Sequence, residues 1–75
     1  MIKDIHAQRL ATISLMLREL RFNYGLTQEQ FAQQINKPRN SVSRAENSCN
    51  LTLLSLFVLL DGYEISLDEF FSGLK

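Results

Sequence analysis

The sequence predicts an all-α fold: a single compact domain of five helices over residues 1–75. Three observations carry this prediction. Apolar residues recur at spacings of three and four, which gathers them on one face of each helix. Start signals, and glycines or an asparagine at expected helix ends, divide the chain into five segments. No Asn-Gly or Asp-Gly pair lies between alternating apolar runs, so strand signals are weak.

The first predicted helix runs from about Asp4 to Asn23. Its apolar stripe consists of residues three or four positions apart, namely Leu10, Ile13, Leu17, Leu20 and Tyr24. Gly25 follows as the expected C-terminal stop, because glycine accepts a positive φ without a Cβ clash. The first helix is therefore expected to present one apolar side to the rest of the domain.

The second and third predicted helices are separated by about three residues. The second starts at Thr27, an N-cap candidate, and Gln30 completes a capping box. The third begins near Pro38 or Arg39 and ends at about position 46, since proline suits a first helical turn. Two short helices joined so closely cross steeply, which predicts a helix-turn-helix motif. Asn36 is the expected turn residue, because asparagine tolerates the left-handed conformation.

The last two predicted helices follow the same start and stop signals. The fourth begins near Thr52 and ends by Asp61, with Gly62 as its stop. The fifth begins after Ser66, and Glu69 three residues later gives a second capping box.

Charge is distributed unevenly along the chain. The formal net charge is zero, yet residues 1–50 carry seven basic and four acidic side chains, whereas residues 51–75 carry one basic and four acidic. This asymmetry favours a basic face and an acidic end. Cys49 is the only cysteine and no apolar leader opens the chain, which predicts a reduced, cytoplasmic protein. The ten-residue apolar run at 51–60 is half a membrane span, so no membrane contact is expected.

The chain offers little chemistry for an enzyme, a cofactor or a metal centre. It has a single histidine, His6, and a single cysteine, with no second metal ligand at helical spacing. It also has no glycine-rich phosphate loop and no pair of carboxylates in an evident cleft. We therefore expect no catalysis, no metal and no cofactor.

The stretch from Leu17 to Phe71 resembles the Cro/C1-type (XRE) helix-turn-helix family of DNA-binding proteins. The matching text is LRELRFNYGLTQEQFAQQINKPRNSVSRAENS, followed by NLTLLSLFVLLDGYEISLDEFF. Residues in the family register occur along its length: Thr27, Gln28, Phe31, Ala32, Val42 and Glu46. The resemblance implies a lambda-repressor-like fold. The segment 47–71 is also similar to the small stand-alone controller proteins of restriction–modification systems.

The resemblance implies a recognition helix over 39–46. The residues expected to contact bases are Arg39, Asn40, Ser43 and Arg44. An arginine fork matches guanine O6 and N7, and an asparagine amide matches adenine N6 and N7. Periodicity alone is equally compatible with solvated surface groups at these positions.

Further roles are expected around this helix. The residues expected to meet phosphates are Gln28, Arg18, Lys37 and Asn47. Arg21 and Glu46 match a family pair that often forms a structural salt bridge between the first helix and the end of the third. Gln28 is the family's phosphate position, although helix capping is an alternative role for it.

Two functions are compatible with these features. The first is a transcription regulator that binds a palindromic operator in double-stranded DNA as a homodimer, because one small module buries too little DNA surface for strong selectivity. Its expected dimer face is Leu60, Tyr63, Ile65, Leu67, Phe70 and Phe71. Adjacent helical positions lie about 100° apart, so one ring of the Phe70–Phe71 pair should enter the core and the other face a partner. The alternative is an antitoxin or another protein-binding module whose C-terminal part binds a toxin.

Overall fold

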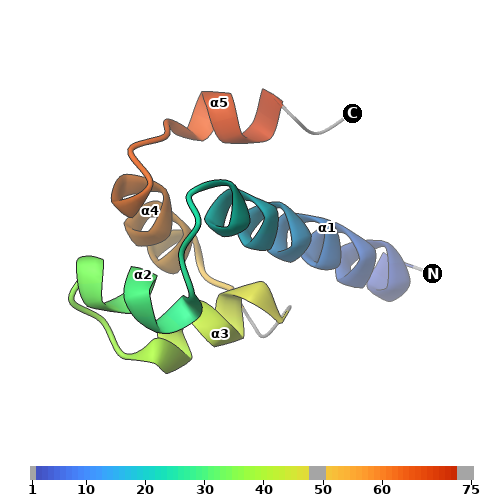
Figure 1. Ribbon diagram of the computed structural model, residues 1–75. Coiled ribbons are helices and arrows are strands. Elements are labelled where there is room, and N and C mark those ends of the chain that lie inside the picture. Colours follow the sequence, from blue (N-terminus) through green and yellow to red (C-terminus); the bar gives the residue numbers. More distant parts are fainter. Residues whose placement is uncertain (1, 48–50, 73–75) are drawn as a thin grey trace.

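The computed structural model describes residues 2–47 and 51–72, which form five helices and no strand (Figure 1). The helices are α1 (Ile2–Asn23), α2 (Gln28–Gln34), α3 (Arg39–Glu46), α4 (Leu53–Gly62) and α5 (Leu67–Ser72). The predicted all-α architecture is confirmed. None of these helices is both long and apolar enough to cross a membrane. Cys49 lies outside the described residues.

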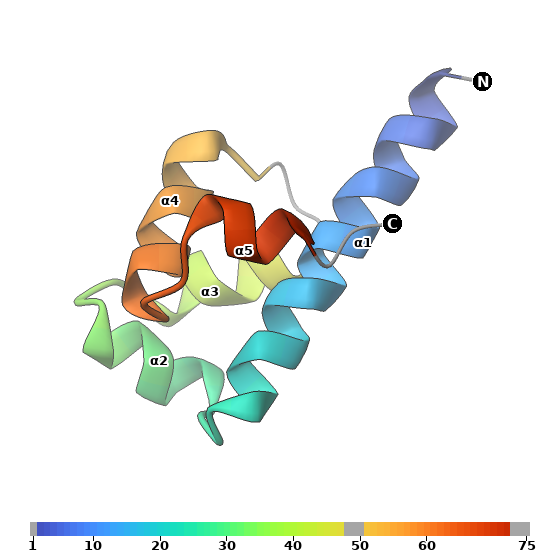
Figure 2. The ribbon, with the colours of Figure 1, turned by 90° about the horizontal axis from the view of Figure 1, so that it is seen from above.

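The helices are arranged in three tiers. In Figure 1, α5 lies on one side, α1 and α4 form the middle, and α2 and α3 lie on the opposite side. Figure 2 shows that the N-terminal half of α1 projects beyond the other helices, so only its C-terminal half packs against them. The helix-turn-helix formed by α2 and α3 is therefore at one surface, separated from α5 by the middle tier.

The hydrophobic core lies where the helices meet. Its buried apolar residues are Leu17, Phe31, Ala32, Val42, Ala45, Leu56, Leu59, Leu60, Tyr63 and Phe70. The ring of Phe31 stacks on that of Tyr63, with centroids 3.9 Å apart and an interplanar angle of 4°. Tyr24 donates its hydroxyl to the Tyr63 carbonyl at 2.6 Å. Burial raises the pKa of the Tyr63 phenol, so this core ring stays neutral at physiological pH.

The local signals read from the sequence act as expected. Thr27 Oγ1 accepts from the Gln30 amide at 3.1 Å, while Gln30 Oε1 accepts from the Thr27 amide at 2.9 Å, which completes the first capping box. The reciprocal bonds between Ser66 and Glu69 complete the second, at 3.1 and 3.3 Å. Asn36 has a φ of 57° and turns the chain between α2 and α3.

Two glycines differ in what they contribute. Gly25 has a φ of 70°, in agreement with its predicted role as the stop after α1. Gly62 is the last residue of α4 rather than a stop beyond it, and the left-handed residue is Glu64, with a φ of 57°. A Cβ at Gly62 would lie 2.9 Å from Phe31 Cζ and closer still to Ile35 Cγ2. The absence of a side chain at Gly62 lets the end of α4 approach α2. Because Gly62 lies within α4, its predicted role as the stop beyond this helix was wrong.

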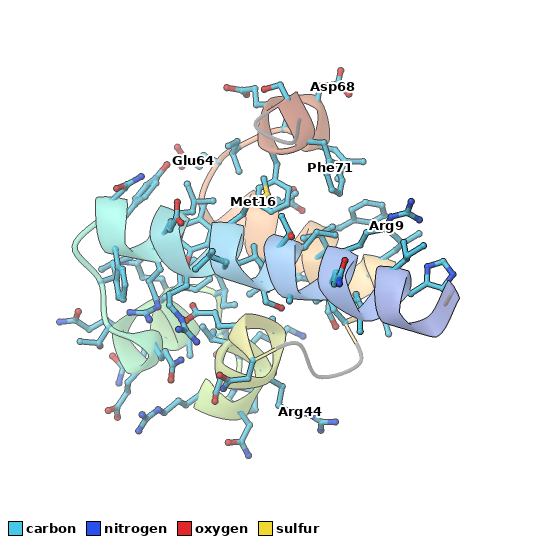
Figure 3. All side chains as sticks on the ribbon, turned by 90° about the vertical axis from the view of Figure 1, so that its right-hand side faces the viewer. Arg9, Met16, Arg44, Glu64, Asp68 and Phe71 are labelled. Atoms are coloured by element: carbon cyan, nitrogen blue, oxygen red, sulfur yellow. The ribbon has the colours of Figure 1, made fainter. Side chains whose placement is uncertain are left out.

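Half of the expected dimer face is inside the monomer. Leu60 and Tyr63 are 2% exposed and Phe70 is 4% exposed, and all three belong to the core where the helices meet. Leu60 and Tyr63 therefore offer no surface to a partner in this fold, and Phe70 is the ring of the Phe70–Phe71 pair that enters the core. Of the other three residues of the expected face, Leu67 is the most exposed, at 38%, and Ile65 and Phe71 are half-buried. Phe71 contacts Phe70 edge to face, with ring centroids 5.2 Å apart (Figure 3).

Candidate nucleic-acid interface

The outer face of α3 carries the exposed residues of the candidate interface. Arg39, Asn40 and Arg44 are exposed, whereas Val42 and Ala45 on the opposite face are 1% and 3% exposed and pack into the core. Figure 3 shows Arg44 pointing away from the body of the molecule on the side opposite α5. The buried face anchors the helix, and the outer face is left free to enter a groove.

The three exposed residues lie on two sides of this outer face. Asn40 and Arg44 line the same groove, of about 370 Å³, between α3 and the start of α4. Arg39 lines a different cleft, of about 480 Å³, beside the connection from α1 to α2. Five residues at about 100° each separate Arg39 from Arg44 by about 140° around the helix axis. Arg39 thus projects to one side of the outer face, and Asn40 and Arg44 project to the other.

Ser43 is placed differently from the other expected base contacts. It is half-buried. Its carbonyl accepts from Asn47 Nδ2 at 2.8 Å and its hydroxyl oxygen accepts from the same nitrogen at 3.3 Å. Ser43 is therefore tied to the C-terminal end of α3, so the structure does not group it with Arg39 and Asn40.

The ion pair expected between Arg21 and Glu46 is present and buried. Arg21 Nε and Nη2 donate to the two carboxylate oxygens of Glu46 at 2.8 and 2.9 Å, and the residues are 7% and 4% exposed. Arg21 Nη1 also donates to the Leu26 carbonyl at 2.7 Å. The hydrogen bond to Glu46 raises the pKa of Arg21, so the guanidinium stays charged. This bidentate pair joins α1 to the end of α3.

The residues expected at phosphates have different surroundings. Arg18 Nη2 donates to the Glu46 carbonyl at 3.1 Å and to Asn47 Oδ1 at 3.3 Å, so Arg18 and Asn47 both engage the end of α3. Gln28 opens α2, and its Nε2 donates to Glu46 Oε1 at 3.2 Å. The N-cap bond of α2 comes from Thr27, which rules out the alternative capping role for Gln28. Lys37 is exposed in the turn before α3.

Ser14 is a residue of this region that sequence reasoning missed. It is 2% exposed, and its hydroxyl donates to the Ala45 carbonyl at 2.6 Å. One signal could have found it: Ser14 lies beside Ile13 and Leu17 on the apolar stripe of α1. A polar side chain at a core position requires a hydrogen-bond partner.

The charges of the folded molecule are separated in space. Glu64 and Asp68 lie at the α5 side in Figure 3, on the opposite side of the molecule from Arg44. The exposed charges of α3 and the turn before it are all basic, at Lys37, Arg39 and Arg44, which favours approach of a polyanion to α3. Among the described residues, no group of three His, Cys, Asp or Glu side chains could hold a metal ion.

Comparisons with known proteins agree with this geometry. A family model described as Helix-turn-helix matches residues 17–70. The crystal structure of the wild-type restriction-modification controller protein C.Esp1396I has a TM-score of 0.75 and 38% identity, over 84% of this chain and 83% of that one. Two point mutants of the same controller protein have TM-scores of 0.75 and 0.76 at 34% identity, over 84% of this chain and 81% and 83% of theirs. No match is found among the curated proteins.

Proposed function

The chain belongs to the Cro/C1-type helix-turn-helix family, and we propose that it regulates transcription by binding a palindromic operator in double-stranded DNA as a homodimer. Its family consists of non-enzymatic DNA-binding proteins. The observation that carries the proposal is the outer face of α3, where Arg39, Asn40 and Arg44 are exposed while the opposite face of the helix is buried.

In this proposal α3 enters the major groove, with its first residues nearest the base edges. Arg39 pairs with guanine and Asn40 with adenine, each through two hydrogen bonds. Arg44 reaches further along the groove, and Ser43 makes a smaller contribution. Lys37 and the start of α2 at Gln28 contact phosphates, which position the protein without reading sequence. The basic α3 face supports this orientation.

The first prediction concerns Arg39. We expect the wild-type protein to prefer a duplex selected from a random pool over a scrambled duplex at near-physiological salt, measured by fluorescence anisotropy. Arg39→Ala should weaken binding to the selected duplex by about 10- to 100-fold, since a bidentate base contact contributes roughly 1–3 kcal/mol. Binding to the scrambled duplex should fall only as far as the loss of one positive charge requires, and the melting temperature should change little because Arg39 is exposed.

Lys37→Ala is the matched control, since it also removes one exposed positive charge. It should weaken binding to both duplexes alike and lower the slope of log affinity against log salt by about one. If Arg39→Ala likewise weakens binding to both duplexes equally, Arg39 does not read bases. A wild-type protein that binds both duplexes equally, and releases both on addition of salt, would contradict the proposed function and favour the protein-binding alternative.

The second prediction concerns the dimer. We propose that the accessible part of α5 and the residues before it pair two copies of the chain, through Ile65, Leu67 and Phe71. Support comes from the apolar character of these residues, and from the tier of α1 and α4 that separates α5 from α3. Pairing through α5 leaves both recognition helices uncovered, so that two half-sites can be read.

Sedimentation equilibrium should therefore show a dimer at micromolar concentration. Leu67→Lys should shift the equilibrium to the monomer, because it places a charge in the proposed interface. Leu15→Lys is the control, since Leu15 is also exposed, at 52%, but lies on α1. A wild-type chain that stays monomeric, or a dimer that tolerates Leu67→Lys, would contradict the proposed face.

A further inference from the structure

The C-terminal end of α3 is capped partly by side chains of another helix, α1. The last four carbonyls of a helix have no partner within the helix and must find other donors. The carbonyls of Ser43 and Arg44 accept from the side chain and backbone of Asn47, at 2.8 and 3.2 Å. The remaining two, at positions 45 and 46, accept from side chains of α1. All four carbonyls are therefore satisfied, half of them by a different helix.

The two donors on α1 are Ser14 and Arg18. Ser14 Oγ donates to the Ala45 carbonyl at 2.6 Å, and Arg18 Nη2 donates to the Glu46 carbonyl at 3.1 Å. Positions 14, 18 and 21 follow the i, i+4, i+7 spacing of one helix face, so both donors lie on the same side of α1 as Arg21. This face of α1 holds the end of α3 at three successive points.

Side chains do not fill all the space beside the end of α3 on this side. A cleft of about 310 Å³ lies beside the junction, lined by Ala11, Ser14, Leu15, Arg18, Glu46 and Asn47. An end that borders such a cleft has room to shift if its hydrogen bonds are lost. The buried face of α3 fixes its depth in the core, and the directional bonds from α1 hold its C-terminal end beside the cleft.

We propose that Ser14 and Arg18 are positioning residues that set the tilt of α3 and thereby its selectivity for operator bases; this inference rests on the proposed function. Their bonds hold the C-terminal end of α3, whereas Arg39 and Asn40 lie at its N-terminal end. An eight-residue helix is about 12 Å long. A tilt of about 5° about one end moves the other end by about 1 Å, which exceeds the distance range of a good hydrogen bond.

This geometry separates two kinds of DNA contact. Bidentate base contacts require the helix at one angle, so they are lost on a small tilt. Phosphate contacts tolerate such a shift, because they depend mainly on charge. Removal of the hydrogen bond from Ser14 or from Arg18 should therefore lower the affinity for the operator much more than the affinity for unrelated DNA.

Ser14→Ala tests this inference without changing any charge. At a temperature where circular dichroism shows the variant fully folded, its affinity for the selected duplex should fall about tenfold, the loss of one bidentate base contact. Its affinity for the scrambled duplex should stay within about twofold of wild type, and the slope of log affinity against log salt should not change, because no charge is removed. Thr12→Ala is the matched control, because Thr12 on the same helix donates only locally, to the Gln8 carbonyl at 3.0 Å.

Arg18→Met gives a second, independent test if Ser14→Ala does not fold. As a positioning residue, Arg18 should affect the selected duplex about tenfold and the scrambled duplex about threefold at most. An equal loss on both duplexes, with a lower salt slope, would identify Arg18 as a phosphate contact and overturn its assignment here. If the wild type prefers the selected duplex and the folded Ser14→Ala variant keeps the same preference, the inference fails while the proposed function stands. If the wild type shows no preference, both fail.

Discussion

Arg21→Ala is expected to lower the free energy of unfolding by about 3–5 kcal/mol, because it leaves the Glu46 carboxylate buried without its main partner. Glu46 is only 4% exposed, so water cannot replace the two lost hydrogen bonds fully. For a domain of this size each kcal/mol corresponds to about 4–8 °C, so the melting temperature should fall by at least about 12 °C. Thermal unfolding followed by circular dichroism measures this shift.

Two further variants distinguish the loss of the Arg21–Glu46 ion pair from the loss of one positive charge on α1. Arg9→Ala removes an exposed arginine from the same helix and should change stability by no more than about 0.5 kcal/mol. The double variant Arg21→Met with Glu46→Leu should recover much of the loss, since it leaves no unpaired buried charge. An unchanged melting temperature for Arg21→Ala would show that the pair contributes nothing to stability.

Phe31→Ala should cost a similar amount, about 3–5 kcal/mol, for a different reason. The Phe31 ring is fully buried and stacks on Tyr63 at 3.9 Å, so the substitution removes apolar burial and leaves a cavity between α2 and the end of α4. Because α2 carries the first half of the helix-turn-helix, DNA binding should fall at temperatures where the variant unfolds. Urea unfolding at 25 °C gives the free energy directly.

Phe22→Ala is the matched control for this substitution. Phe22 is 60% exposed, and its ring lies 4.8 Å from the Arg21 guanidinium. Because the Phe22 ring is mostly in solvent, the loss of this cation–π contact should cost at most about 1 kcal/mol. Equal losses for Phe22→Ala and Phe31→Ala would mean that the stack on Tyr63 does not contribute to the core as proposed.

The sequence by itself determined the features that depend on neighbouring residues. The capping box at Thr27, the left-handed turn at Asn36 and the positive φ at Gly25 all appear where local signals predicted them. Each depends on atoms within a few residues of one another, so the residue types alone indicate the geometry. The apolar spacing likewise indicated which side of α1 packs inward.

Only the tertiary structure decided which partner each buried or bonding group meets. Leu60 and Tyr63 were expected at a partner surface but lie in the core, because burial depends on how the helices pack against one another. Ser14 meets a carbonyl 31 positions away in the sequence, and Arg18 meets one 28 positions away. Periodicity shows that a residue points inward or outward, but it carries no information on which distant atom lies opposite. The third helix could therefore be located from sequence, whereas the contacts that hold its end required the packed fold.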